Sequence, residues 1–163
     1  MTTDPVDNFI AQWARERPDL QFDAMATIAR VGRFAALAGK SIDATLGEHE
    51  LHVAEFDVLA AIRRLGKPFT TTPSALTRAL MLSPAGMTSR LDRLEAAGFI
   101  ERLADPGDRR SLLVVLTKKG QTTIDAAVVD HVANEERLLA GLTARDRTAL
   151  DNLLRKLTKQ FES

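Results

Sequence analysis

The chain has 163 residues, of which 45% are hydrophobic and 27% are charged, a composition typical of a soluble globular protein with a core of its own. It contains no cysteine, which excludes disulfides, thiolate metal sites and a cysteine nucleophile. No apolar run is long enough to span a membrane and the first residues show no secretory signal pattern, so we expect a cytoplasmic protein.

The net charge is zero, but the charges are unevenly distributed along the chain. Residues 67–120 hold nine Lys and Arg against five Asp and Glu, a net charge of +4, and the rest of the chain carries the opposite charge. A positive segment within a neutral protein is typical of a local contact with a polyanion. The contrast is modest, and it indicates nucleic-acid binding only together with the motifs that follow.

The first part of the chain predicts three helices. Asp4 followed by Pro5 is a helix start, and the helix should end near Arg17. A proline-free stretch with apolar residues at helical spacing then continues to Gly47, which predicts a long helix. The third helix is closed by Gly66.

Two short helices with the same start signal come next. Thr72 precedes Pro73 and Ser83 precedes Pro84, so in both cases a capping hydroxyl stands before a proline at the first helical position. The second of these helices ends before Gly98, and only a few residues separate the two. Two short helices joined by a tight turn are typical of a helix-turn-helix motif.

A β-hairpin is predicted directly after this motif. Residues 99–103 and 112–116 have the composition of strands, and Asp-Pro-Gly-Asp at 105–108 is turn chemistry. The tip carries Arg109 and Arg110. A basic hairpin after a helix-turn-helix indicates a winged helix. In this interpretation the capped helix enters the major groove of DNA and the arginines reach the minor groove.

Two further helices, with Thr117 and Thr143 as their N-caps, are predicted at the end of the chain. The last of them has an apolar stripe at helical spacing, made of Leu150, Leu153, Leu154, Leu157 and Phe161. We therefore expect a mostly α fold with a small β-hairpin wing, a winged helix-turn-helix with a helical dimerisation region. Residues 1–48 and 121–163 would provide the dimerisation helices, and residues 49–120 the DNA-binding lobe.

Residues 82–100 and 105–111, with Leu116-Thr117 closing the hairpin, resemble the MarR family of transcriptional regulators in sequence and spacing. In helix order the resemblance covers nearly the whole chain. It implies a homodimer that binds an inverted repeat in double-stranded DNA. It also implies that Arg110 inserts into the minor groove and that Asp108 orients this arginine.

The same resemblance implies roles for the residues of the second short helix. Thr88 and Ser89 occupy the base-reading face, with Ser89 where many members of the family carry Arg or Asn. Arg93 would contact phosphate or pair with Asp92 or Glu95. The expected DNA-binding residues are Ser83, Thr88, Ser89, Arg93, Arg109 and Arg110.

A narrower resemblance concerns the urate-responsive regulators of this family, which add a Trp-bearing helix at the N-terminus. Trp13, Asp57 and Arg90 match their effector-binding positions, and Leu65 stands where they carry an Asn. The resemblance implies a small anionic effector without specifying urate. Two alternatives stay open: Trp13 is a packing anchor, and Asp57 with Arg90 forms a structural salt bridge. The pair could also be both, a salt bridge and a lock that an anion breaks by competing for the arginine.

Enzymatic and metal chemistry have little support in this sequence. We expect no catalytic residues and no cofactor, because there is neither a glycine-rich phosphate loop nor a nucleophile elbow. Residues 48–52 place His49 and His52 three positions apart among carboxylates, but a zinc site needs three or four ligands, so a solvated loop is the main interpretation and metal binding the alternative. His131 stands alone and is interpreted as structural.

The sequence thus predicts a ligand-responsive transcriptional regulator, a repressor that binds a palindromic operator as a homodimer. Two alternatives remain: a nucleoid-type DNA-binding protein without an effector, and a winged-helix module used only for protein–protein assembly. Two adjacent arginines in the wing favour DNA over the second alternative.

Overall fold

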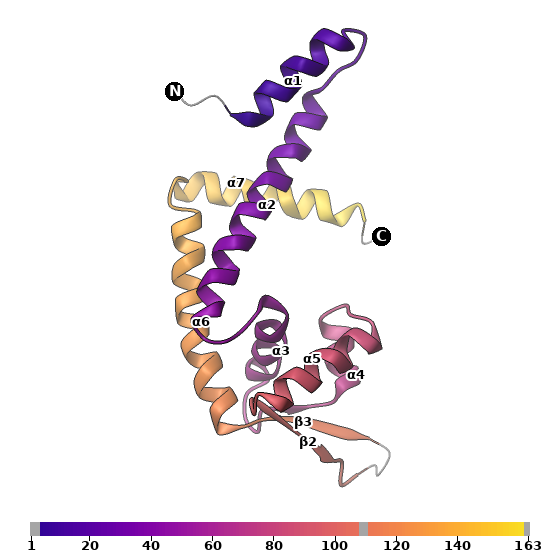
Figure 1. Cartoon of the computed structure of the whole chain (residues 1–163), viewed down its shortest axis with the longest axis vertical. Helices are drawn as coiled ribbons and strands as arrows, with labels where there is room; N and C mark the ends of the chain where they lie inside the picture. Colours follow the sequence, from indigo (N-terminus) through magenta and orange to yellow (C-terminus); the bar gives the residue numbers. More distant parts are fainter. Residues whose placement is uncertain (1–3, 108–110, 162–163) are drawn as a thin grey trace. The chain divides into compact units, whose positions relative to one another are not determined.

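The computed structural model describes residues 4–107 and 111–161. These residues form two compact units, Met1–Ser41 and Ile42–Ser163, with a mostly helical fold and one small sheet, as predicted. The elements, shown in Figure 1, follow in the order α1 (Pro5–Glu16), α2 (Asp23–Gly47), α3 (Val53–Arg64), β1 (Thr70–Thr71), α4 (Pro73–Ala79), α5 (Pro84–Ala96), β2 (Ile100–Ala104), β3 (Leu112–Leu116), α6 (Lys118–Leu138) and α7 (Ala144–Lys159). No helix in the described residues is long and apolar enough to cross a membrane.

The predicted helix starts are confirmed by their capping hydrogen bonds. In each, a side-chain oxygen accepts a hydrogen bond from a backbone N–H two or three residues later, at 3.0–3.2 Å. Such a bond satisfies one of the N–H groups that a helix leaves unpaired at its start. The caps are Asp4, Thr72, Ser83, Thr117 and Thr143.

The wing is part of a three-stranded antiparallel sheet in the order β1-β3-β2. The predicted hairpin is present, with Ile100 opposite Leu116 and Ala104 opposite Leu112. The additional strand β1 pairs Thr70 with Val115 and was not predicted. It is only two residues long, which is too short to show the alternation by which strands are recognised in a sequence.

The core of the second unit lies between α3, α4, α5, the sheet and the start of α6. Its fully buried side chains come from all of these elements and include Leu59, Ile62, Leu76, Leu91, Leu94, Val114 and Ile124. Burial of this set fixes α4 and α5 against α3 and leaves one face of α5 to solvent. In Figure 1, α5 and the β2–β3 hairpin lie next to one another on this lobe.

The helix α6 begins in very close contact with the end of α5. Gly120 lies in its first turn, where a β-carbon would lie 1.9 Å from the carbonyl oxygen of Phe99. Thr117 adds a side-chain hydrogen bond to the carbonyl of Gly98, at 2.7 Å. The chain therefore passes from wing to α6 through a junction that has no room for a side chain at position 120.

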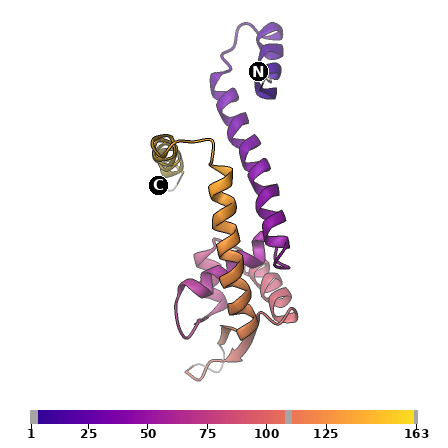
Figure 2. The ribbon, with the colours of Figure 1, turned by 90° about the vertical axis from the view of Figure 1, so that its left-hand side faces the viewer.

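The last helix, α7, is joined to α6 by Arg147, which forms an ion pair with Glu136 at 2.6 Å and donates to the carbonyl of Leu139 at 3.1 Å. None of its residues is buried, and its apolar stripe faces solvent, with Leu153 59% exposed. Figure 2 shows α6 extending from the lobe, with α7 turning away at its end. The second unit alone therefore leaves this stripe uncovered.

The first unit consists of α1 and most of α2. Arg30 on α2 forms ion pairs with Asp4, at 2.8 Å, and with Asp7. Trp13 stacks on Phe22 with ring centroids 6.3 Å apart. The α2 helix carries a row of exposed apolar side chains, Met25, Ile28, Val31, Phe34 and Leu37.

Candidate nucleic-acid interface and adjoining cavity

The helix α5 has one face in the core and one in solvent. Met87, Leu91 and Leu94 are buried, whereas the neighbouring Thr88 and Ser89 are exposed. Successive residues of a helix differ in direction by about 100°, so these two side chains share the outer surface. Both side chains are therefore exposed to solvent, and their role in base reading stays a prediction.

Each of the two exposed hydroxyls takes part in a hydrogen bond within the helix. Thr88 Oγ1 donates to the carbonyl of Pro84 at 3.0 Å. Ser89 Oγ accepts from the Nη1 group of Arg93 at 2.8 Å, since a guanidinium has no acceptor. The two side chains are thus held by bonds of opposite direction.

The pairing predicted for Arg93 within its own helix was wrong. Its Nε donates to Glu55 of α3 at 2.7 Å, and the carboxylate of Glu55 is largely buried. The expected partners, Asp92 and Glu95, both pair instead with Arg102 of β2, at 2.8 and 2.5 Å. The prediction failed because the fold brings Arg102 of β2 to these two acids, and the spacing within α5 gives no indication of that contact.

Arg102 attaches the base of the wing to α5. Glu95 accepts from the backbone N–H of Arg102 at 3.0 Å as well as from its side chain, and this pairing lowers the pKa of the Glu95 carboxyl. The strand β2 therefore starts in a fixed position relative to α5. The predicted wing residues Asp108, Arg109 and Arg110 lie outside the described residues.

Asp57 and Arg90 lie in the same charged neighbourhood but do not form a direct salt bridge among the described residues. Arg90 donates from Nη1 to the carbonyl of Ala54 at 3.3 Å. Partial burial raises the pKa of Asp57 above its ordinary value, and the nearby charges of Arg90, Arg64 and His131 oppose this shift. A carboxylate whose charged form is disfavoured by burial and partly balanced by cations is often part of a functional site.

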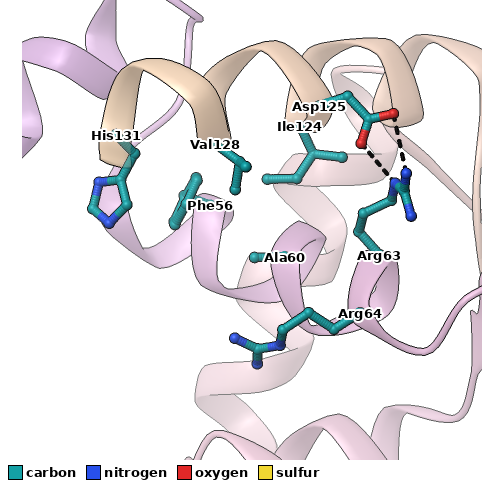
Figure 3. A pocket seen from close by; sticks show the side chains of 8 residues that line it. All are labelled: Phe56, Ala60, Arg63, Arg64, Ile124, Asp125, Val128 and His131. Carbon is teal, nitrogen blue, oxygen red and sulfur yellow. Dashed lines mark hydrogen bonds and ion pairs between the residues drawn. The ribbon is translucent and has the colours of Figure 1, made fainter. Parts of the chain in front are cut away.

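A cavity of about 410 Å³ opens between α3 and α6. Figure 3 shows apolar side chains between the two helices and charged groups around them; the lining residues are Phe56, Ala60, Arg63, Arg64, Ile124, Asp125, Val128 and His131. Arg63 is paired with Asp125 at 2.6 Å. Arg64, by contrast, forms no ion pair among the described residues.

His131 packs its ring against Phe56, with centroids 4.7 Å apart, and its Nε2 lies 3.2 Å from Glu135. Its Nδ1 is buried and has no hydrogen-bond partner in the described part of the chain. The histidine interpreted as structural is therefore also part of the cavity wall, together with Arg64. The charges of both residues also counteract the rise in the pKa of Asp57, which links that carboxylate to the cavity.

Trp13 lies in the first unit, where it is 47% exposed. With Gln12 and Glu16 it lines a shallow hollow of about 300 Å³. Its role at an effector site stays a prediction.

No group of three or more potential metal ligands occurs among the described residues. The Nε2 atom of His49 lies 2.8 Å from the carboxylate of Asp130 on α6. His52 is the residue before α3 and is exposed.

Three of the residues described above were not singled out from the sequence: Glu55, Arg64 and Arg102. Glu55 gave a readable signal, because it lies on the apolar face of α3 at helical spacing from Leu59 and Ile62. A charge on a buried face needs a partner. The partner itself could not be named, since Arg93 lies 38 positions away.

Known proteins resemble this chain in sequence and structure. A family model described as "MarR family" matches residues 49–111. The transcriptional regulator PecS of Dickeya dadantii is 38% identical over 156 residues, covering 96% of this chain and 94% of PecS. Mutant MarR from Escherichia coli, complexed with operator DNA, superposes with a TM-score of 0.73 and 27% identity, covering 85% of this chain and 98% of MarR.

A second similar structure is that of BpsR from Bordetella bronchiseptica, with a TM-score of 0.70, 26% identity and coverage of 80% of this chain and 91% of BpsR. It is described as showing regulation of DNA binding by 6-hydroxynicotinic acid.

Proposed function

This chain belongs to the MarR family of winged helix-turn-helix transcriptional regulators, and from that premise we propose that it is a repressor that binds a palindromic operator as a homodimer and leaves it when a small anion binds. Membership identifies a DNA-binding regulator rather than an enzyme. The operator symmetry, the homodimer and the effector are the parts that we propose.

The observation that carries the proposal is the outer face of α5. Its N-terminus is capped by Ser83 and presents a positive helix dipole, which suits a phosphate group. Thr88 and Ser89 are exposed on the same helix, where they can reach base edges in the major groove. The similar E. coli MarR structure contains operator DNA, which supports this use of the helix.

The homodimer is supported by apolar surface that neither unit covers. The stripe on α7 and the row on α2 are both exposed, and large exposed apolar patches mark interaction sites. A two-fold dimer would present two copies of α5 to two half-sites about one helical turn, roughly 10 bp, apart. The arginines of the wing, Arg109 and Arg110, would then follow the flanking minor grooves.

The effector is proposed to be a small anion that binds in the cavity between α3 and α6. The apolar walls fit a planar ring, and Arg64 offers a guanidinium that forms no ion pair with an acidic side chain of the described residues. Regulation of BpsR by 6-hydroxynicotinic acid, an aromatic carboxylic acid, supports this class. Asp57, Arg90 and Trp13 remain the proposed contacts of the effector beyond the cavity.

The release of DNA is proposed to pass through α3, because this helix both lines the cavity and is hydrogen-bonded to α5. Two arginines of α5 donate hydrogen bonds to the first turn of α3. Arg90 donates to the carbonyl of Ala54, and Arg93 donates to the side chain of Glu55. An anion that moves α3 therefore moves the reading helix. A tenfold loss of DNA affinity requires only about 1.4 kcal/mol of coupling between the two sites.

The test is a DNA-binding titration on the palindrome found by footprinting the protein's own upstream region. Aromatic carboxylates, urate and citrate-like acids are added in turn, and release is followed by fluorescence anisotropy. We expect at least one acid to release the DNA, and Arg64→Gln to weaken its effect about tenfold while Arg145→Gln, which removes an exposed arginine of α7, leaves it unchanged. Absence of specific binding, or equal responses of the two variants, would contradict the proposal.

A further inference from the structure

The two exposed hydroxyls on α5 differ in what they can offer to DNA. Thr88 already donates its O–H to the carbonyl of Pro84, so only its lone pairs remain for a further hydrogen bond, and the residue is exposed. Ser89 already accepts a hydrogen bond from Arg93, so its own O–H is free to donate and only one of its lone pairs is left. Of these two neighbours on the reading helix, Thr88 can therefore only accept, whereas Ser89 has a free O–H with which to donate.

The polarity of Ser89 depends on where Arg93 is held. An arginine with no partner samples many rotamers, and its bond to a serine four residues earlier is weak in water. Here the guanidinium has a second attachment, because its Nε donates to Glu55 at 2.7 Å while its Nη1 donates to Ser89 at 2.8 Å. Two different nitrogen atoms of the guanidinium are therefore held by hydrogen bonds.

Glu55 is suited to hold the arginine in one place. Its side chain is only 10% exposed, and it lies in the first turn of α3, where the helix dipole stabilises a negative charge. Its Oε2 atom is buried and has no hydrogen-bond partner in the described residues. The carboxylate is therefore buried, and its Oε1 accepts from a single cation, Arg93.

No other acid in the described residues competes for Arg93. Asp92 and Glu95, its neighbours on α5, are both engaged by Arg102. The pairing of Arg102 with these two acids leaves the Glu55–Arg93–Ser89 chain of contacts as a separate unit.

We propose that Glu55 is a positioning residue for base reading: through Arg93 it fixes Ser89 as a hydrogen-bond donor beside Thr88 as an acceptor. Ser89 would then select a base edge that accepts, namely purine N7, guanine O6 or thymine O4. Thr88 would select the amino group of adenine or cytosine, or the methyl group of thymine. This inference rests on the proposed operator binding, and it adds which of the two hydroxyls donates a hydrogen bond to a base and which accepts one.

The experiment combines protein variants with base analogues in the operator. The preferred palindrome is first selected from random DNA with the full-length wild-type protein. Each purine or thymine of a half-site is then replaced by an analogue lacking one acceptor: 7-deazapurines for N7, 2-aminopurine for guanine O6, and 5-methyl-2-pyrimidinone for thymine O4. We expect one position per half-site at which loss of the acceptor weakens wild-type binding about fivefold, the size of one hydrogen bond.

At that position the analogue should not weaken DNA binding by Ser89→Ala, because the variant lacks the hydroxyl that would donate to the acceptor. Glu55→Gln keeps the shape of the side chain but removes its charge, and should reduce the penalty to about twofold. The matched control is Glu95→Gln, the same substitution in the other ion-paired cluster of α5. It should lower overall affinity by loosening the wing and leave the fivefold penalty in place.

A second arm tests the opposite polarity of Thr88. Purine replaces adenine in the operator and thereby removes the amino donor, and the variant is Thr88→Val, which has the same shape without the hydroxyl. We expect a penalty in the wild type that Thr88→Val abolishes and Ser89→Ala preserves.

The outcomes separate this inference from the proposal on which it rests. Selection of no sequence by the wild type would overturn operator binding, and the inference with it. Selection of a palindrome, with the acceptor penalty intact in Ser89→Ala or equally reduced in Glu55→Gln and Glu95→Gln, would overturn the inference alone.

Discussion

Among the glycines of the described residues, Gly120 has the least room for a side chain. Because a β-carbon there would lie 1.9 Å from the carbonyl oxygen of Phe99, Gly120→Ala must displace backbone at the start of α6. We expect a loss of about 3 kcal/mol in the free energy of unfolding, at the upper end for overpacking. Gly32→Ala, on an open face of α2, should be neutral or slightly stabilising. Urea denaturation of both variants measures the difference, and equal stabilities would contradict the described junction.

Asp57 is expected to reduce stability at neutral pH. Its pKa in the folded chain is raised above the ordinary 3.8 by burial, so the folded state binds this proton more tightly than the unfolded state does. The penalty is therefore present above the raised pKa and disappears as pH falls through it. We expect Asp57→Asn to raise Tm at neutral pH, and the gain to vanish in acid. A gain that persisted in acid would show that the charge of Asp57 is not its cause.

The resemblance to the MarR family placed Thr88 and Ser89 on the base-reading face of their helix. In the structure both are exposed while Met87 and Leu91 are buried, and base reading itself stays a prediction. The partner of Arg93 was not predictable in this way. It depends on how α3 and α5 pack, and packing brings together residues that no local pattern relates.

At the scale of elements, the capped start of α5 leads to a prediction that separates stability from DNA binding. Ser83→Ala removes the cap and should reduce stability by about 1 kcal/mol. Ser83→Asn keeps an accepting oxygen and should preserve both stability and DNA affinity. Ser83→Asp caps equally well, but its negative charge faces phosphate, so we expect normal stability with a loss of DNA affinity.

The measurements are thermal unfolding and an operator titration on the same three proteins. Unchanged operator affinity of Ser83→Asp would mean that the start of α5 does not approach the phosphates. The capping geometry itself would stand, since only Ser83→Ala tests it.

Elements with chemical boundary signals were predicted well, and β1, which has none, was missed. Every expected hydroxyl cap was found at its position, because capping depends on residues adjacent in sequence. β1 has no such signal. Thr70 and Thr71 become a strand only because β3 offers them a free edge, which is a property of the folded lobe.

For the whole molecule, the exposed stripe on α7 predicts that dimerisation can be broken with single charges. Leu153→Asp should produce monomers, because it places a carboxylate in the apolar stripe. Asn152→Asp adds the same group on the opposite side of the helix and should leave the dimer intact. Light scattering at micromolar concentration distinguishes the two; a monomeric wild type would contradict the proposed assembly.

The same helix has a consequence for the lifetime of the protein. With no buried residue, α7 is held in an isolated subunit by a capping box, the ion pair between Arg155 and Asp151 and the contacts of Arg147. A helix of 16 residues is marginal in water without packing. Dilution should therefore open residues 144–159 to proteases. Limited proteolysis across a concentration series would show this as cleavage that rises as the protein is diluted. Subunits made in small numbers would be degraded before they met, and those made above a threshold would protect one another, so that synthesis rate would set turnover as well as abundance.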